Sequence, residues 1–305
     1  MRALVLSGAG NFGALQAGAL EPLFETGFRP ELIVGTSAGA LNGILLASDP
    51  TAAGARHAQQ AWSQVSLHEI GMPGLLASVR RLATRKDSLL PNIPLARFVA
   101  RSLGMDLTTF GELQSVCGVR VRAMAVCMET GELIAFGDRE TDRILDGAMS
   151  STALPPYLPP WRVGGRRYLD GGVLTKLPLL AAIERGATQI VALNVTGALG
   201  RAREARGMLA VAGRALSLAN EAMTQREIDL ARLTGAEIHL LDLEAPEGVA
   251  FWDFSQAEGL REEGRKAARA WLDSAPLRLG APWRAAARVR MAGLGRRLER
   301  LASNE

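Results

Sequence analysis

The stretch LVLSGAGNFGALQAG, residues 4–18, decides the opening of the fold. It overlaps an apolar run, RALVLS (2–7), which is typical of a buried strand. A glycine-rich loop follows at once, and apolar residues at helical spacing come after it. The order strand, loop, helix places backbone N–H groups at a helix N-terminus, where they bind negative charge. The glycine spacing, G-x-G-x-x-G, is also that of a dinucleotide-binding turn.

A dinucleotide site requires an acidic residue at the end of the second strand, about 20 residues further on. The second predicted strand is ELIVG (31–35), and the residues that follow it are Thr36-Ser37-Ala38-Gly39. No acid stands at that position. We therefore expect no bound dinucleotide. No other cofactor is expected.

The second strand instead runs into GTSAG (35–39), a G-x-S-x-G motif followed by the helical pattern ALNGILLAS. This strand–turn–helix context is that of a nucleophile elbow, in which a strained turn exposes the serine hydroxyl at a helix N-terminus. Gly35 and Gly39 are small enough to permit the sharp bend. Ser37 is the candidate nucleophile, and a glycine-rich turn with an incidental serine is the alternative.

A serine nucleophile requires a base. His239 follows Asp170 in the chain, so a Ser-Asp-His order is arithmetically possible, but His239 lies in the alternating run EIHLLDL (237–243) and is expected to be a strand residue. The better candidate is Asp170 itself, at the end of a short strand and followed by two glycines, Gly171 and Gly172, that allow another backbone to approach. Taken alone, D-G-G is also a common turn.

The three pieces together resemble the patatin-like phospholipase family, on SGAGNFG (7–13), GTSAG (35–39) and DGG (170–172). The stretches 150–179 and 253–264 are also similar to that family, and the resemblance covers about residues 3–272. It implies a Ser-Asp dyad without histidine, formed by Ser37 and Asp170.

The resemblance also implies that the first loop is an oxyanion hole, made by N–H groups of Gly8, Ala9 or Gly10 and supported by Gly13. Two residues depart from the family pattern. Ala9 stands where a glycine is common, and Phe12 stands where a basic residue is common. Phe12 removes a cation that would meet an anionic head group, so the substrate preference is the property that this change is expected to affect.

The chain as a whole predicts an α/β fold, a three-layer α/β/α sandwich around a mainly parallel central sheet, patatin-like in its order of motifs. Further strands are expected at 119–128, 132–137, 187–195 and 237–243, with a hairpin at 161–172. Helices are expected over most of 51–115, in 141–160 ahead of a proline-rich loop, at about 204–234 and at about 255–274. Residues 1–275 form the expected catalytic domain.

Residues 276–305 are predicted to be a basic amphipathic helical extension. Apolar residues fall three or four apart from Trp283 to Leu301, and six arginines surround them. Such a helix lies on an anionic bilayer through 281–301, or it packs on the domain or on a partner chain.

Composition excludes several other classes. The net charge of +4 comes almost wholly from arginine, and no nucleic-acid-binding motif accompanies it. Three scattered histidines predict no metal site, and Cys117 and Cys127 are expected to be buried thiols in a reducing compartment. No apolar run reaches the roughly 18 residues of a spanning helix, and the N-terminus lacks a signal cleavage pattern. We expect a cytoplasmic protein, peripheral at most to the inner membrane surface.

The resulting hypothesis is a serine lipid acyl hydrolase of the phospholipase A or lysophospholipase type. It acts on a lipid or acyl-ester substrate through an acyl-enzyme on Ser37, with Asp170 as base. Two alternatives stay open: a soluble esterase or thioesterase with the same chemistry, and a catalytically weak lipid- or protein-binding module.

Overall fold

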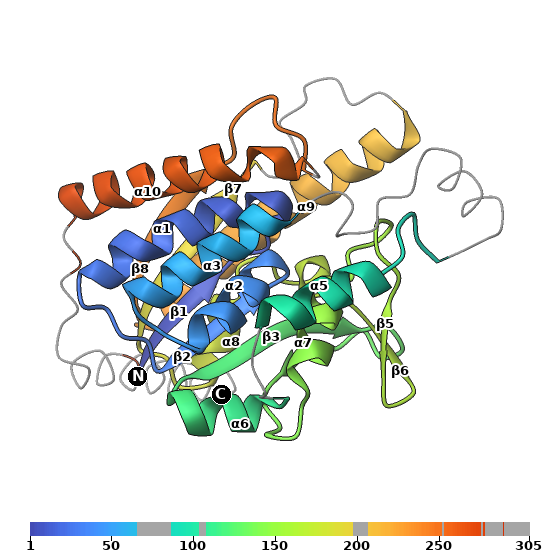
Figure 1. The fold of residues 1–305 in the computed structure, drawn as a ribbon, viewed down its shortest axis with the longest axis horizontal. Coiled ribbons are helices and arrows are strands. Elements are labelled where there is room, and N and C mark those ends of the chain that lie inside the picture. The colour runs from blue at the N-terminus through green and yellow to red at the C-terminus, as the bar shows by residue number, and fades with distance from the viewer. Residues whose placement is uncertain are drawn as a thin grey trace, which may run out of the picture.

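The computed structural model contains one eight-stranded sheet with helices on both faces (Figure 1). It describes residues 1–65, 87–103, 108–197, 207–251 and 253–275, together with Leu277 and Val289. Part of the helical region predicted at 51–115 and almost all of the tail at 276–305 lie outside these residues.

The centre of the sheet is parallel. Its strands are β1 (Arg2–Leu6), β2 (Leu32–Thr36), β3 (Arg120–Cys127), β7 (Gln189–Thr196) and β8 (Glu237–Glu244). They lie in the order β3-β2-β1-β7-β8, and every neighbouring pair is parallel. The continuous apolar runs of β1 and β2 suit strands that are covered on both faces. The prediction of a mainly parallel central sheet is confirmed.

Three shorter strands extend the sheet in the antiparallel sense. They are β4 (Leu133–Phe136), β5 (Trp161–Val163) and β6 (Arg166–Asp170). The predicted hairpin joins β5 to β6 through Gly164 and Gly165, whose φ angles are 56° and 81°. Positive φ at both central residues is the geometry of a two-residue hairpin turn, and glycine adopts it without steric cost.

Alternate residues of β1 point into separate apolar cores, which gives the three layers. Leu4 and Leu6 belong to the larger core, and Ala3 and Val5 to the smaller one. The larger core is covered by α1 (Gly13–Glu25), α2 (Ala38–Ala47), α3 (Ala52–Gln64), α5 (Ile93–Leu103), α6 (Phe110–Cys117), α7 (Ile144–Ser151) and α10 (Ala257–Ser274). The smaller core is covered by α8 (Leu179–Glu184) and α9 (Met208–Leu233). The sequence did not predict α8, because six residues are too few to show a helical period.

Helices α1 and α10 pack at unusually close range. A Cβ atom added at Gly18 would lie 2.0 Å from the carbonyl oxygen of Arg261, and one added at Gly264 would lie 2.0 Å from that of Leu15. Both glycines therefore let one backbone approach the other. This contact fixes α10, and with it the loop that precedes α10, against the first helix of the fold.

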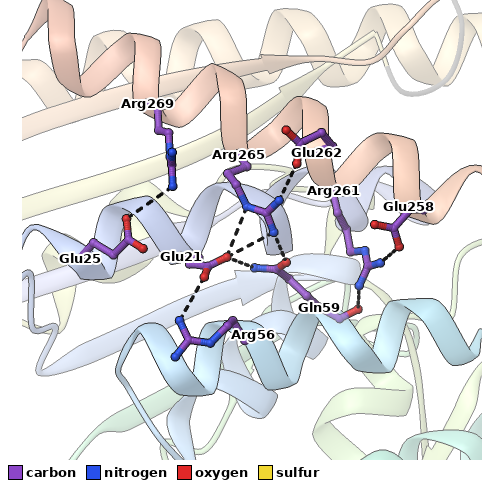
Figure 2. A network of polar contacts seen from close by, with 9 residues as sticks. All are labelled: Glu21, Glu25, Arg56, Gln59, Glu258, Arg261, Glu262, Arg265 and Arg269. Atoms are coloured by element: carbon purple, nitrogen blue, oxygen red, sulfur yellow. Dashed lines mark hydrogen bonds and ion pairs between the residues drawn. The ribbon is translucent and has the colours of Figure 1, made fainter.

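A polar network joins α1, α3 and α10 beside this contact (Figure 2). At its centre Glu21 accepts hydrogen bonds from Arg56 Nη1 at 3.0 Å and from Gln59 Nε2 at 3.1 Å, and it pairs with Arg265 at 3.3 Å. Burial raises the pKa of Glu21, but the bonds from Gln59 and Arg56 and the charge of Arg265 outweigh it and hold that pKa below its ordinary value. The carboxylate is thus ionised and shared by three helices.

Candidate active site

Strand β3 brings the two candidate dyad residues together. Thr36, at the end of β2, pairs with Met124 of β3, and Asp170, at the end of β6, pairs with the next residue, Ala125. β2 runs parallel to β3 and β6 runs antiparallel to it, on the opposite side, and this register brings the carboxyl ends of β2 and β6 to adjacent positions of β3. Ser37 follows Thr36 directly, so the register of the sheet places it beside Asp170.

Ser37 has the backbone strain expected of a nucleophile elbow. Its φ of 55° and ψ of −123° make it the one non-glycine residue with positive φ in the described part of the chain. Such a conformation costs about 1–3 kcal/mol and persists only where the surroundings hold it. Here Ser37 caps α2, and its N–H donates to Ser151 Oγ at 2.9 Å. Ser151 was not predicted, since no motif marks a serine whose hydroxyl accepts from a distant backbone N–H.

The two elbow glycines stand where backbones nearly touch. A Cβ at Gly35 would lie 2.5 Å from the carbonyl carbon and oxygen of Gly39, and one at Gly39 would lie 2.4 Å from the carbonyl oxygen of Leu6. The first contact closes the elbow on itself. The second packs the start of α2 against the end of β1, immediately before the glycine-rich loop.

Asp170 is a buried carboxyl group, in a residue that is 1% exposed. Its Oδ1 accepts from the Gly172 N–H at 2.7 Å, and its own N–H donates to the carbonyl of Ala153 at 3.0 Å. Burial raises the pKa of Asp170 to about 7, while hydrogen bonding with Ser37 and with Gly172 lowers it. A carboxyl group with this pKa is far more basic than an ordinary aspartate and suits a general base at neutral pH.

The contact between Asp170 and Ser37 is loose in this structure. The hydroxyl is close enough to lower the pKa of the carboxyl, yet Oδ2 has no partner of standard hydrogen-bond geometry among the described residues. Catalytic hydrogen bonds are often long without substrate and shorten in the complex. Gly171 keeps the loop close to β3, because a Cβ there would lie 2.5 Å from the carbonyl oxygen of Met124.

The glycine-rich loop lies against the nucleophile. A Cβ at Gly8 would come within 3.5 Å of Ser37 Cβ. The Gly8 N–H, however, donates to the carbonyl of Lys176 at 2.9 Å, so it already has an acceptor in this structure, and its place in the oxyanion hole stays a prediction. Ala9 caps a short 3₁₀ turn that begins at Gly10, and the N–H groups at a helix start have no intrahelical acceptor. Those of Ala9 and Gly10 have no partner in the described part of the chain and are the available donors.

The two departures from the family pattern are explained by the local structure. Ala9 has a φ of −150°, which any residue adopts, so no glycine is needed there. Phe12 is 1% exposed and belongs to the larger apolar core, so its side chain does not line the entrance to the site. Gly13 is held at close range, since a Cβ there would lie 2.3 Å from the Trp62 ring.

Gly10 is the residue of this loop that tolerates substitution least. Its φ is +59°, and an added Cβ would lie 2.2 Å from the Phe251 ring. We expect Gly10→Ala to displace an oxyanion donor and to lower kcat by about 10²–10³-fold, the typical loss for one donor. Gly118→Ala is the matched control, because Gly118 also has a positive φ, +72°, but open space around it and no place in the site. Equal kinetics for the two variants would contradict the assignment.

Thr175 and Lys176 connect the glycine-rich loop, the Ser37 elbow and the Asp170 segment, and sequence reasoning missed them. The carbonyl of Thr175 accepts from the Thr36 hydroxyl at 3.1 Å, and its N–H donates to the carbonyl of Gly171 at 2.8 Å. The carbonyl of Lys176 holds Gly8. These bonds are made largely by backbone groups, so no sequence motif could have predicted them.

Side chains anchor the same two residues to helix α9 and to strand β7. Glu227 of α9 accepts from Thr175 Oγ1 at 2.5 Å, and Lys176 Nζ donates to the carbonyl of Val195. Burial lowers the pKa of Lys176 to about 8, against the opposing effect of the Glu221 and Asp242 charges. The segment that carries Asp170 is therefore tied to both β7 and α9.

The alternative bases lie on other elements than Ser37 and Asp170. His239 lies in β8 and contacts Glu237 Oε1 at 3.1 Å, as expected of a strand residue, and His57 is exposed on α3. Cys127 is buried, whereas Cys117 is half-buried rather than fully buried as predicted, and both are free thiols. The described residues contain no group of three or more His, Cys, Asp or Glu side chains that would hold a metal ion.

Comparison with protein-family models gives a match that covers more than half of the chain. A family model described as patatin-like phospholipase matches residues 4–183. Among curated proteins, patatin-like phospholipase domain-containing protein 7 of Mus musculus is 25% identical over 196 residues, which is 63% of this chain and 13% of that protein. The protein of the same name from Rattus norvegicus is 26% identical over 200 residues, with the same shares. The chain therefore corresponds to a small part of these relatives.

Solved structures show distant similarity. VipD from Legionella pneumophila has a TM-score of 0.47 and 15% identity, covering 90% of this chain and 67% of that chain. Human GIVD cytosolic phospholipase A2, in complex with methyl gamma-linolenyl fluorophosphonate, has a TM-score of 0.46 and 10% identity, covering 90% of this chain and 59% of that chain. Likenesses this distant carry no information about function.

Proposed function

Because the chain belongs to the patatin-like phospholipase family, we propose that it hydrolyses lipid carboxylic esters through an acyl-enzyme on Ser37, with Asp170 as the base. The observation that carries the proposal is the register at β3, which sets a strained serine beside a buried carboxyl group whose pKa is about 7. The N–H groups of Ala9 and Gly10, which lack partners among the described residues, supply the third requirement of acyl transfer, an oxyanion hole.

The reaction then has two balanced halves. Ionised Asp170 takes the proton of the Ser37 hydroxyl as Oγ attacks the ester carbonyl carbon, and the N–H groups of Ala9 and Gly10 bind the developing oxyanion. The tetrahedral intermediate collapses, the C–O bond to the alcohol breaks, and Asp170 returns its proton to that alcohol. A water molecule repeats the sequence on the acyl-enzyme, releasing the fatty acid and restoring Ser37.

The pKa of Asp170 predicts the pH dependence of hydrolysis. Only the ionised carboxylate accepts a proton, and burial raises its pKa to about 7. We expect kcat/KM to rise about tenfold per pH unit below that pKa and to level off above it, since kcat/KM reports groups of the free enzyme. The measurement is hydrolysis of a soluble ester from about pH 5 to pH 9. A profile flat across this range would exclude Asp170 as the titrating base.

The substrate class is tested with matched acyl donors. Wild type and Ser37→Ala are compared on phospholipid vesicles, on a lysophospholipid and on a short-chain soluble ester or thioester, with fatty-acid release as the readout. The proposal predicts Ser37-dependent release from the lipids. Release from the soluble substrates alone would indicate an esterase or thioesterase, and Ser37-independent lipid binding without release would indicate a binding module.

We propose further that residues 1–275 are the catalytic domain and that the basic segment 281–301 contacts an anionic membrane at the inner, cytoplasmic surface. Apolar residues at helical spacing and surrounding arginines are the composition of a helix that lies in a bilayer interface. Two free cysteines accord with a reducing compartment. Among the described helices, none has both the length and the apolar composition needed to cross a bilayer.

Deleting residues 281–305 is expected to weaken binding to anionic vesicles and to leave hydrolysis of a soluble ester unchanged, because the dyad lies in the preceding domain. Cosedimentation with vesicles of phosphatidylcholine and phosphatidylserine measures the vesicle binding. The electrostatic part of this binding should decrease as salt is added. Undiminished binding after the deletion would assign the tail to packing on the domain or on a partner chain.

A further inference from the structure

Two buried amide side chains outside the dyad hold both ends of the glycine-rich loop. Gln16 of α1 and Asn42 of α2 are each 0% exposed. Gln16 Nε2 donates to the carbonyl of Ser7 at 2.8 Å, immediately before the loop. Asn42 Nδ2 donates to the carbonyl of Gly13 at 2.9 Å, immediately after it. The loop that offers the Ala9 and Gly10 N–H groups is therefore fixed at its start and at its end by side chains.

The two amides also bond to each other. Asn42 Nδ2 donates to Gln16 Oε1 at 3.2 Å, and Trp62 Nε1 of α3 donates to Asn42 Oδ1 at 2.7 Å. An indole N–H only donates and backbone carbonyls only accept, so each amide has one orientation that satisfies its neighbours. A buried polar network that is fully satisfied is rigid and specifies one arrangement.

Further bonds extend the network to the centre of the sheet. Gln16 Nε2 also contacts the Ser7 hydroxyl at 3.2 Å and the carbonyl of Leu193 at 3.3 Å. The Ser7 hydroxyl accepts from the Val195 N–H at 2.9 Å. The carboxyl end of β1 is thus bonded to β7 through the same group that Gln16 holds.

The position of Asn42 gives the network a consequence for the chemistry. Asn42 lies in the second turn of α2, the helix whose N-cap is Ser37. A rigid helix connects it to the nucleophile, while its Nδ2 connects it to the loop. The Gln16–Asn42 pair therefore sets the distance between the oxyanion donors and Ser37 Oγ, which must be held closely for acyl transfer.

We propose that Gln16 and Asn42 are positioning residues that fix the oxyanion loop relative to the nucleophile elbow, with Trp62 orienting Asn42. The inference rests on the proposed function. It predicts that the two residues govern the reaction of Ser37 and leave substrate binding unchanged, since both side chains are fully buried.

The test compares Gln16→Met, Asn42→Leu and the double variant with Gln59→Met. Gln59 is a matched control, because it is an equally bonded amide, 4% exposed, that joins α3 to Glu21 and Arg265 away from the loop (Figure 2). The readouts are the second-order rate of fluorophosphonate labelling, kcat and KM on a soluble ester, the melting temperature, and hydrogen exchange of the peptide that covers residues 7–13. Trp62→Phe is a milder variant if the others do not fold.

We expect Gln16→Met and Asn42→Leu each to lower the labelling rate and kcat by about 10- to 100-fold with KM unchanged, the effect of a misplacement near 1 Å. Exchange of the 7–13 peptide should become faster in both. The double variant should lose little more than either single variant, because the pair acts as a unit. Gln59→Met should keep wild-type labelling and exchange at 7–13, even if its melting temperature falls.

Two results would overturn the proposal. One is a labelling rate that falls in proportion to the melting temperature in Gln16→Met, Asn42→Leu and Gln59→Met alike. The other is unchanged hydrogen exchange of residues 7–13 in Gln16→Met and Asn42→Leu. Failure of the proposed function gives a different result. In that case folded wild type does not label at all, and the exchange of residues 7–13 still decides whether Gln16 and Asn42 hold the loop.

Discussion

Replacing Asp170 with asparagine should lower kcat/KM by about 10²–10⁴-fold at pH 8, the range lost with a general base. Asparagine has nearly the same shape and still accepts from the Gly172 N–H, but it takes no proton from Ser37. Hydrolysis of a soluble ester measures the loss, and the remaining rate should no longer change with pH near 7. Full activity in Asp170→Asn would remove this carboxyl group from the mechanism.

The same substitution should change stability in a pH-dependent way. The folded-state pKa of Asp170, about 7, is raised above the ordinary value of 3.8, so ionising the buried carboxyl group opposes folding. As pH rises between these two values, wild type loses stability relative to Asp170→Asn, and above the folded-state pKa the difference is constant. Melting temperatures of both proteins at several pH values test this. If the melting temperature of wild type does not fall relative to that of Asp170→Asn as pH rises, the carboxyl group is not buried as described.

Replacing Ser37 should abolish the reaction and also reveal the strain of the elbow. Ser37→Ala and Ser37→Gly both remove Oγ, and we expect losses of about 10⁴-fold or more, as for other serine nucleophiles. Only glycine relieves the positive φ, so Ser37→Gly should be more stable than Ser37→Ala by about 1–3 kcal/mol. Denaturant unfolding of the two inactive variants gives the difference. Equal stabilities would show that the turn is not strained.

The sequence predicted the elements that carry motifs. The strand before SGAGNFG, the elbow at GTSAG and the hairpin that ends at Asp170 all have turn residues or an unbroken apolar run that marks them. The family resemblance then predicted Ser37 and Asp170 as a pair, although they lie far apart in the sequence. Their proximity was not visible in either motif, because it depends on the register that both strands share with β3.

What the sequence could not predict depends on backbone geometry. The bond from the Gly8 N–H to the carbonyl of Lys176 is one example, because every residue carries a carbonyl and no motif marks this one. Phe12 looked like a change in substrate recognition, but its ring is in the core. No motif marks Gln16 or Asn42 as more than a polar residue in an apolar helix, and only their bonds to the two ends of the loop distinguish them.

The most direct test of the account is intact-mass spectrometry of folded wild type and of Ser37→Ala after treatment with a fluorophosphonate. An activated serine beside a base and an oxyanion hole reacts with this reagent, whereas an ordinary serine does not. The account predicts a single adduct on wild type and none on Ser37→Ala. No adduct on folded wild type, or an adduct that persists in Ser37→Ala, would contradict it.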